Sequence, residues 1–115
     1  MDVIIYHNPR CSKSRKTLEI LEQNQIQPIV VEYLSSPPNH QQLDSILRGL
    51  DMQPMDLIRR GEEKFKALQL DQQELSRDQL IEIMIQHPRL IERPIVVAGH
   101  QVVIGRPPEA VLALL

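Results

Sequence analysis

The chain has 115 residues, of which 42% are hydrophobic and 24% are charged, and its formal net charge is −2. This length suits one domain with its own core, and the near-balanced charge argues against a nucleic-acid binder. A single cysteine excludes an intramolecular disulfide and a multi-cysteine metal site. With no recognisable signal peptide and no apolar run long enough for a membrane span, we expect a reduced, cytoplasmic protein.

The first predicted elements form a βαβ unit. Residues 3–7 are a short β-branched run typical of a buried strand, 12–24 carry a helical pattern, and 29–33 are a second run of the buried type. Two strands joined by a helix within about thirty residues are expected to pair in parallel. The helix side chains expected to face the core are Leu18, Ile20 and Leu21.

The middle of the chain is predicted to be helical. A helix near 40–49 follows a proline-containing loop, and a broken helical pattern covers 54–70. Ser76 and Gln79 have the spacing of a capping box, which opens a helix that ends before Pro88. The side chains predicted to form the buried face of this helix are Leu80, Ile81, Met84 and Ile85.

The last part of the chain is predicted to form a hairpin and a helix. Strands at 94–97 and 102–104 flank a glycine-containing turn, and a final helix covers 109–115. The order β-α-β, helical insertion, β-β-α predicts an α/β fold with a mixed four-stranded sheet. We expect a single domain over 1–115 with the helical insertion at about 39–88.

Cys11 lies at the predicted junction of the first strand and the first helix. Cations and a helix N-terminus favour the thiolate, the nucleophilic form of cysteine, and the N–H groups of residues 12–15 suit an anion. Four of the 13 basic residues lie within five positions of Cys11, which leaves 9 basic against 15 acidic residues elsewhere. The alternative is a small, buried and inert cysteine. The nearby cations are Arg10, Lys13, Arg15 and Lys16, and Ser12 and Ser14 add hydroxyl groups.

The spacing around Cys11 argues against two other thiol chemistries. A thiol phosphatase loop needs an arginine six positions after the cysteine, where this chain has Thr17. A C-x-x-C pair needs a second cysteine where Ser14 stands, so an external thiol must resolve any disulfide formed at Cys11. His7 is a candidate for orienting Asn8 or tuning the thiol, and equally for a structural histidine.

Arginines at the ends of predicted elements are candidates for binding an oxyanion. Arg59 or Arg60 precedes Gly61, Arg93 precedes the hairpin and Arg106 follows it. Because a hairpin returns the chain to its starting edge, we expect Arg93 and Arg106 to project from the same edge of the sheet. Guanidinium groups offer paired N–H donors to tetrahedral oxyanions, and the alternative for each arginine alone is an exposed surface residue.

Four blocks of the sequence stand out together. They are Ile5-Tyr6-His7-Asn8-Pro9-x-Cys11-x-x-Ser14-Arg15-x-Thr17-Leu18, Tyr33-Leu34, Glu92-Arg93-Pro94-Ile95-Val96-Val97 and Arg106-Pro107-Pro108-Glu109. These blocks run collinearly over nearly the whole chain, which resembles the glutaredoxin-coupled arsenate reductase family. The resemblance implies a thioredoxin-like fold in which Pro94 is a cis-proline. It also implies that Cys11 is the nucleophile and that Arg59, Arg93 and Arg106 bind the oxyanion, with Arg59 favoured over Arg60.

The same resemblance implies a reaction cycle. Cys11 would form a thiol–arsenate adduct, glutathione as cosubstrate would reduce the arsenic to arsenite, and glutaredoxin would resolve the resulting mixed disulfide. The implied site has His7, Ser14, Arg15 and Pro94 as supporting residues, and it needs no metal and no tightly bound cofactor. Arg10 and the pair Ser12-Lys13 differ from the small residue and the Gly-Thr pair of well-studied members, and the sequence ends at Leu115 without their C-terminal extension. In these respects the chain resembles a shorter branch of the family.

Two other functional classes remain open at this stage. Another branch of the same fold family binds RNA polymerase and senses redox state, usually through C-x-x-C, which Ser14 interrupts. A monothiol protein that is only glutathionylated, or that acts on a different oxyanion or disulfide, would share Cys11. Simple glutathionylation would not require the three arginines.

Overall fold

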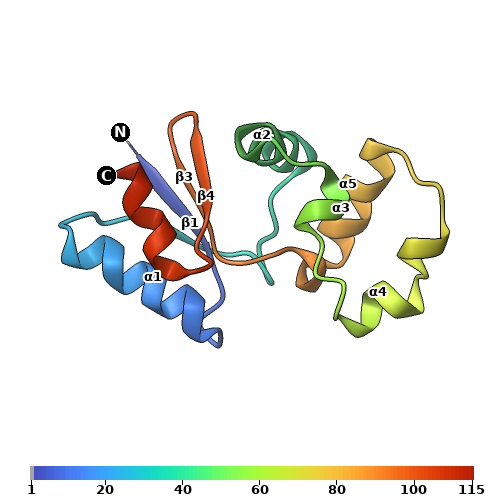
Figure 1. Cartoon of the computed structure of the whole chain (residues 1–115), viewed down its shortest axis with the longest axis horizontal. Helices are drawn as coiled ribbons and strands as arrows, with labels where there is room; N and C mark the ends of the chain where they lie inside the picture. The colour runs from blue at the N-terminus through green and yellow to red at the C-terminus, as the bar shows by residue number, and fades with distance from the viewer. Residues whose placement is uncertain (1) are drawn as a thin grey trace. The chain divides into compact units, whose positions relative to one another are not determined.

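The computed structural model describes residues 2–115 (Figure 1). Contacts between residues divide the chain into two compact units: Met1–Pro37 with Arg93–Leu115, and Pro38–Glu92. The second unit contains the predicted helical insertion, for which the sequence suggested limits of about 39–88. Within the described residues, no helix combines the length and the apolar character needed to cross a bilayer.

A four-stranded sheet forms the centre of the first unit. The strands lie in the order β2-β1-β3-β4; β1 pairs in parallel with β2 and antiparallel with β3, and β3 pairs antiparallel with β4. This topology confirms the predicted mixed sheet and places β1 inside it. The strands are β1 (Val3–His7), β2 (Ile29–Glu32), β3 (Ile95–Ala98) and β4 (Gln101–Ile104).

The prediction that the run at 29–33 is a buried strand was wrong. β2 is an edge strand of the described sheet with β1 as its neighbour, and Ile29 and Val30 are 54% and 45% exposed. A β-branched run indicates strand propensity, but it does not specify how many neighbours the strand has.

Helix α1 (Ser12–Gln23) and the 3₁₀ helix η3 (Pro108–Leu114) pack on the same side of the sheet (Figure 1). The predicted inward positions of α1 are confirmed for Ile20 and Leu21, whereas Leu18 is only half-buried. The buried face of α1 instead continues toward its N-terminus through two polar side chains. The core cluster of this unit comprises Ile5, Ile20, Leu21, Val96 and Val111.

The final helix differs in type from the prediction, because η3 is a 3₁₀ helix. Its first turn closes by a bond from the Ala110 N–H to the Pro107 carbonyl at 2.9 Å, which is the i to i+3 pattern of this helix type. Pro108 at the first position has no N–H to donate, so it suits the start of the helix.

The second unit is helical. Its capping boxes at Asn39 and Ser76 begin α2 and α5, and the second of these confirms the predicted box. The predicted buried face of α5 is confirmed for Leu80, Ile81 and Met84, while Ile85 is half-buried. The elements are α2 (His40–Leu50), α3 (Pro54–Leu57), α4 (Glu63–Ala67), η1 (Leu70–Gln72), α5 (Arg77–Gln86) and η2 (Pro88–Leu90).

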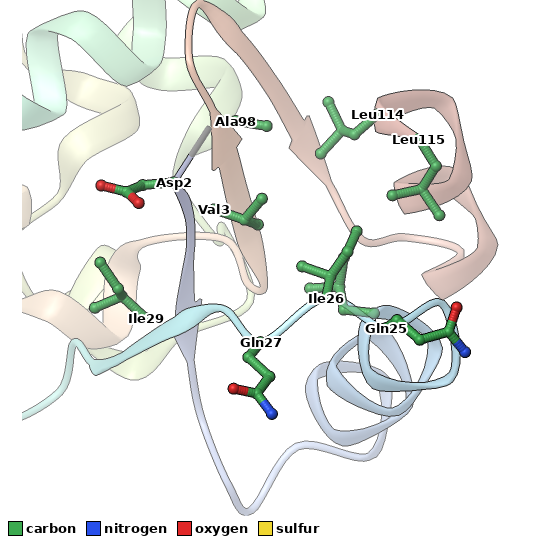
Figure 2. Close-up of a pocket in the computed structure, with 10 residues that line it drawn as sticks. Asp2, Val3, Gln25, Ile26, Gln27, Ile29, Ala98, Leu114 and Leu115 are labelled. Carbon is green, nitrogen blue, oxygen red and sulfur yellow. The ribbon is translucent and has the colours of Figure 1, made fainter.

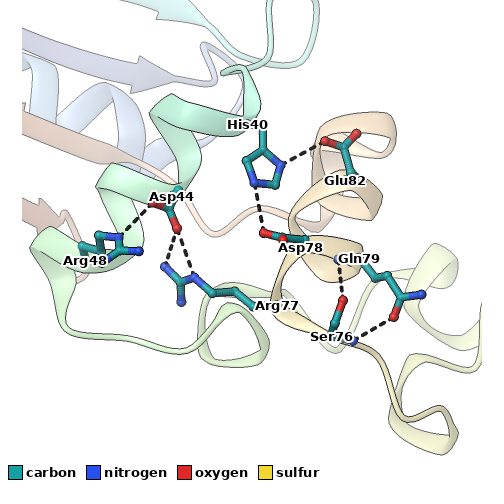
Figure 3. Close-up of polar contacts among 8 residues, drawn as sticks. All are labelled: His40, Asp44, Arg48, Ser76, Arg77, Asp78, Gln79 and Glu82. Atoms are coloured by element: carbon teal, nitrogen blue, oxygen red, sulfur yellow. Dashed lines mark hydrogen bonds and ion pairs between the residues drawn. The ribbon is translucent and has the colours of Figure 1, made fainter.

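An arginine and a carboxylate join α2 to α5 (Figure 3). Arg77 donates to Asp44 Oδ1 from Nε at 3.0 Å and from Nη2 at 2.9 Å, and Arg48 donates from Nε to Asp44 Oδ2 at 2.8 Å. The hydrogen bonds from Arg48 and Arg77 lower the pKa of Asp44 below its ordinary value of 3.8.

A histidine makes a second link between the same helices. His40 Nδ1 lies 3.0 Å from Glu82 Oε1, and His40 Nε2 lies 3.2 Å from Asp78 Oδ1 (Figure 3). The hydrogen bond with Glu82 and the charges of both carboxylates raise the pKa of His40 above 6.5. The imidazolium form is therefore the form that this link stabilises.

Candidate active site

Cys11 is the N-cap residue of α1 and follows closely on the end of β1. Its backbone is extended, and its N–H donates to the Asn8 carbonyl at 3.0 Å. The residue is partly exposed, unlike the fully buried cysteine of the inert alternative.

Three hydrogen bonds fix the turn that leads from β1 to Cys11. The Asn8 N–H donates to Ser14 Oγ at 3.0 Å, and the Arg10 N–H donates to Asn8 Oδ1 at 3.0 Å. Arg15 reaches back from the first turn of α1 and donates from Nη1 to the Pro9 carbonyl at 2.9 Å. Ser14 and Arg15 thus hold the turn against the helix that Cys11 begins.

His7 and Ser14 form a buried polar pair behind this turn. Ser14 Oγ lies 2.6 Å from His7 Nδ1, and the two residues are 0% and 6% exposed, respectively. Burial lowers the pKa of His7 below 6.5, while the charge of Glu32 opposes this effect and that of Arg15 adds to it. At neutral pH a neutral imidazole can accept the Ser14 hydroxyl hydrogen, leaving Ser14 Oγ to accept from the Asn8 N–H.

The cations predicted to surround Cys11 lie at the surface. Arg10, Lys13, Arg15 and Lys16 are all exposed. Lys16 Nζ lies 3.5 Å from Glu19 Oε1, with both side chains about half exposed, so this pair contributes little to stability.

Arg93 and Arg106 lie together at one end of the β3–β4 hairpin. Arg106 Nε donates to the Arg93 carbonyl at 2.9 Å, and Nε and Nη1 of Arg93 are shielded from solvent. Ile95 pairs with Ile104 at this end of the ladder, so the hairpin brings the two arginines back together as predicted. The Arg93–Pro94 peptide bond is cis, which confirms the isomer that the family resemblance implied for Pro94.

Arg59 belongs to the second unit and contacts carboxylates there. Its Nη1 bonds to Glu62 Oε1, and its Nε lies 3.8 Å from Glu92 Oε1. Arg60, the other candidate at this place in the sequence, is exposed. A role for Arg59 beside Cys11 stays a prediction.

A pocket of about 380 Å³ lies at the opposite end of β1 from Cys11 (Figure 2). Among the described residues that line it, none carries a thiol or a cationic side chain, which an oxyanion site is expected to offer. The lining residues are Asp2, Val3, Leu21, Gln25, Ile26, Gln27, Ile29, Ala98, Leu114 and Leu115.

Two residues that matter for the geometry escaped the sequence reasoning. Thr17 is fully buried, and its hydroxyl donates to the Lys13 carbonyl at 2.8 Å. Gly105 is buried directly before Arg106. The spacing of Ser14, Thr17 and Leu21 at i, i+3 and i+7 is a signal that could have placed Thr17 on the inward face of α1.

The strand order β2-β1-β3-β4, with a half-buried thiol at the N-cap of α1, defines an α/β protein of the thioredoxin-like fold. Comparison with known protein families identifies one family within this fold class. The ArsC family matches residues 6–114, and the chain belongs to this family.

Individual relatives agree with this assignment. A protein of Escherichia coli K12 named as uncharacterized protein YfgD is 47% identical over 114 residues, which cover 98% of this chain and 96% of that one. An arsenate reductase of Haemophilus influenzae is 47% identical over 116 residues, with both chains fully covered. The solved structure of an arsenate reductase from Vibrio cholerae has a TM-score of 0.95 and 46% identity, and the match covers 100% of this chain and 98% of that one.

Proposed function

We propose that this protein reduces arsenate to arsenite, with the thiolate of Cys11 as the nucleophile. The observation that carries the proposal is the partly exposed thiol at the N-cap of α1, in a turn fixed by hydrogen bonds. A helix N-terminus favours both a thiolate and a bound anion. The Haemophilus influenzae and Vibrio cholerae relatives named as arsenate reductases support arsenate as the substrate.

In the first step, Sγ of Cys11 attacks arsenic(V). A sulfur–arsenic bond forms and a hydroxide leaves, which a proton converts to water. The turn around Cys11 favours this step because it presents the sulfur at a fixed place, and holding reactants in the right geometry lowers the barrier.

The second and third steps need external thiols, because the chain has only one cysteine. The thiolate of glutathione attacks Sγ, a sulfur–sulfur bond forms, and the electron pair of the broken sulfur–arsenic bond stays on arsenic. Arsenic is reduced to arsenite while the two sulfurs are oxidised to a mixed disulfide. A glutaredoxin thiolate then attacks the glutathione sulfur and releases Cys11.

The arginines of the hairpin supply the proposed oxyanion contacts. Arg93 and Arg106 offer planar guanidinium groups, which match a tetrahedral oxyanion better than a single ammonium does. Arg59 is the third proposed ligand. His7, Ser14 and Arg15 act at a distance from the substrate, since their contacts hold the turn that carries Cys11.

The test is arsenite formation by the purified protein with glutathione and glutaredoxin. We expect steady turnover by the wild type and none above background for Cys11→Ser, because a hydroxyl cannot replace the thiolate in either bond exchange. Absence of arsenite from the wild type, or turnover retained by Cys11→Ser, would contradict the proposal. Glutathionylated Cys11 without turnover would favour the monothiol alternative.

The choice of reductant is tested separately. Replacing glutathione and glutaredoxin with thioredoxin and its reductase is expected to abolish turnover, because the adduct at Cys11 then meets no glutathione. Equal rates with the two systems would refute the glutaredoxin coupling while leaving arsenate reduction in place.

A further inference from the structure

We propose that Gly105 is a positioning residue for oxyanion binding. The lack of a side chain at this position allows the segments that carry Arg93 and Arg106 to pack directly on α1, the helix that Cys11 begins. This inference rests on the proposed function, which assigns both arginines to the oxyanion.

Gly105 is buried between Thr17 of α1 and the ring of Pro94. A β-carbon at Gly105 would lie 2.7 Å from Pro94 Cγ, closer still to Thr17 Oγ1, and 3.1 Å from Thr17 Cγ2. β-Carbons in real proteins essentially never come within 3.0 Å of such atoms. In the part of the chain that the structure describes, the glycine with positive φ is Gly99, so Gly105 is needed for space and not for its backbone conformation.

The atoms around Gly105 have little freedom to move away. Thr17 is fully buried, and its hydroxyl is committed to the Lys13 carbonyl at 2.8 Å. The Pro94 carbonyl accepts from the Gly105 N–H at 2.9 Å, so these two residues move as a pair. An added β-carbon would therefore push Gly105 away from α1 and press on the Pro94 ring, so both residues would shift.

This displacement would reach both proposed oxyanion ligands at once. Arg93 directly precedes Pro94, Arg106 directly follows Gly105, and Arg106 Nε donates to the Arg93 carbonyl at 2.9 Å. The same face of α1 carries Ser14, one turn before Thr17, which holds the turn beside Cys11. The same face of α1 therefore positions two parts of the proposed site. These are the turn that carries Cys11 and the segments that carry Arg93 and Arg106.

The main test is Gly105→Ala in the arsenate assay. We expect the KM for arsenate to rise by about tenfold, because displaced guanidinium groups would contact the bound oxyanion less well in the ground state and the transition state alike. The kcat at saturating arsenate should stay within about threefold, since the thiol turn is unchanged. A merely structural role would lower the active fraction, and so kcat, and leave KM unchanged.

A control variant and two further measurements make this test specific. Gly61→Ala is the matched control, because a β-carbon at Gly61 meets nothing within 4 Å, and its KM should equal that of the wild type. The NMR signal of the Arg106 Nε–H should shift in Gly105→Ala. Alkylation of Cys11 by the uncharged reagent iodoacetamide should stay within about twofold of the wild-type rate.

A second substitution can relieve the crowding. Thr17→Ala removes Oγ1 and Cγ2, which are two of the three atoms nearest to the added β-carbon, so Thr17→Ala/Gly105→Ala should bind arsenate better than Gly105→Ala does. The double variant also carries the test if Gly105→Ala does not fold. An unchanged KM in Gly105→Ala, or no improvement in the double variant, would overturn the positioning role. Wild-type protein that forms no arsenite would instead contradict the proposed function.

Discussion

The two compact units of this chain use their arginines differently. In the first unit, Arg15 and Arg106 each donate to a main-chain carbonyl oxygen. In the second unit, Arg59 and Arg77 contact carboxylates. A carbonyl orients a guanidinium and leaves its formal charge in place, whereas a carboxylate both orients it and compensates the charge.

The proposed function expects some of these arginines to act on a substrate, whereas Arg77 joins two helices. A group that binds an oxyanion must offer positive charge to it, and a carboxylate already at the same guanidinium competes for that charge. Arg77 meets Asp44 between α2 and α5, which suits a structural role. Arg59 is the informative case, because the proposed function needs it as a ligand while Glu62 and Glu92 already contact it.

The largest expected difference between the units is catalytic. Arg106→Ala should lower kcat/KM for arsenate by about 10²-fold, equivalent to about 2.7 kcal/mol of lost transition-state stabilisation. Arg106→Lys should recover only part of this loss, because an ammonium cannot replace the planar pair of donors. Arg77→Ala is the matched control from the second unit and should keep kcat/KM near the wild-type value. Equal losses in both alanine variants would refute the division of roles.

A smaller catalytic effect is expected at Arg59. Arg59→Ala should reduce kcat/KM by about tenfold, less than Arg106→Ala, because the carboxylates of Glu62 and Glu92 already share its charge. The same arsenite assay measures this ratio. If Arg59→Ala lowers kcat/KM as much as Arg106→Ala does, then the carboxylate contacts of Arg59 do not limit its contribution to arsenate reduction.

The sequence predicted the parts of this molecule that depend on local pattern. The strand–turn–helix around Cys11, the capping box at Ser76 and the return of Arg106 to Arg93 all follow from short-range signals. The burial of β2 was predicted wrongly, because exposure depends on which strand lies beside it. The close approach at Gly105 was missed for a related reason, since Thr17 is distant in sequence and only tertiary packing brings it there.

The two carboxylate partners of Arg59 also differ in whether a local sequence pattern indicates them. Its partner Glu62 lies three residues away across a turn and is therefore a local contact, whereas Glu92 comes from a distant part of the sequence. No local pattern indicates the second contact.

Alanine substitutions of two serines, one in each unit, should change the free energy of unfolding by different amounts. Ser14→Ala should lower the free energy of unfolding by about 2 kcal/mol, because the half-buried Asn8 N–H and the buried His7 Nδ1 both lose their partner. Ser45→Ala, at an exposed position of α2, should change it by less than about 0.5 kcal/mol. Urea unfolding at neutral pH measures both values. A loss at Ser14 no larger than that at Ser45 would show that the turn network does not stabilise the fold.

The smallest expected effects are on the pH dependence of stability, and they come from two histidines whose pKa values shift in opposite directions. Burial lowers the pKa of His7 below 6.5, so the unfolded chain binds a proton there before the folded one does. The contribution of His7 to the free energy of unfolding is therefore complete above about pH 6.5. It is lost as the pH falls through the folded-state pKa of His7. Glu82 and Asp78 raise the pKa of His40, so its contribution is complete below about pH 6.5 and is lost as the pH rises through its folded-state pKa.

NMR titration of the imidazole signals should show His7 titrating below 6.5 and His40 above it. His40→Gln should then lower stability in urea more at about pH 6 than at about pH 8, because only the protonated ring gains from Glu82 and Asp78. A loss that is independent of pH would mean that the two carboxylates hold His40 by hydrogen bonding without help from its charge. Such a result would remove the expected contrast between a neutral, buried histidine in the first unit and a charged, partly exposed histidine in the second.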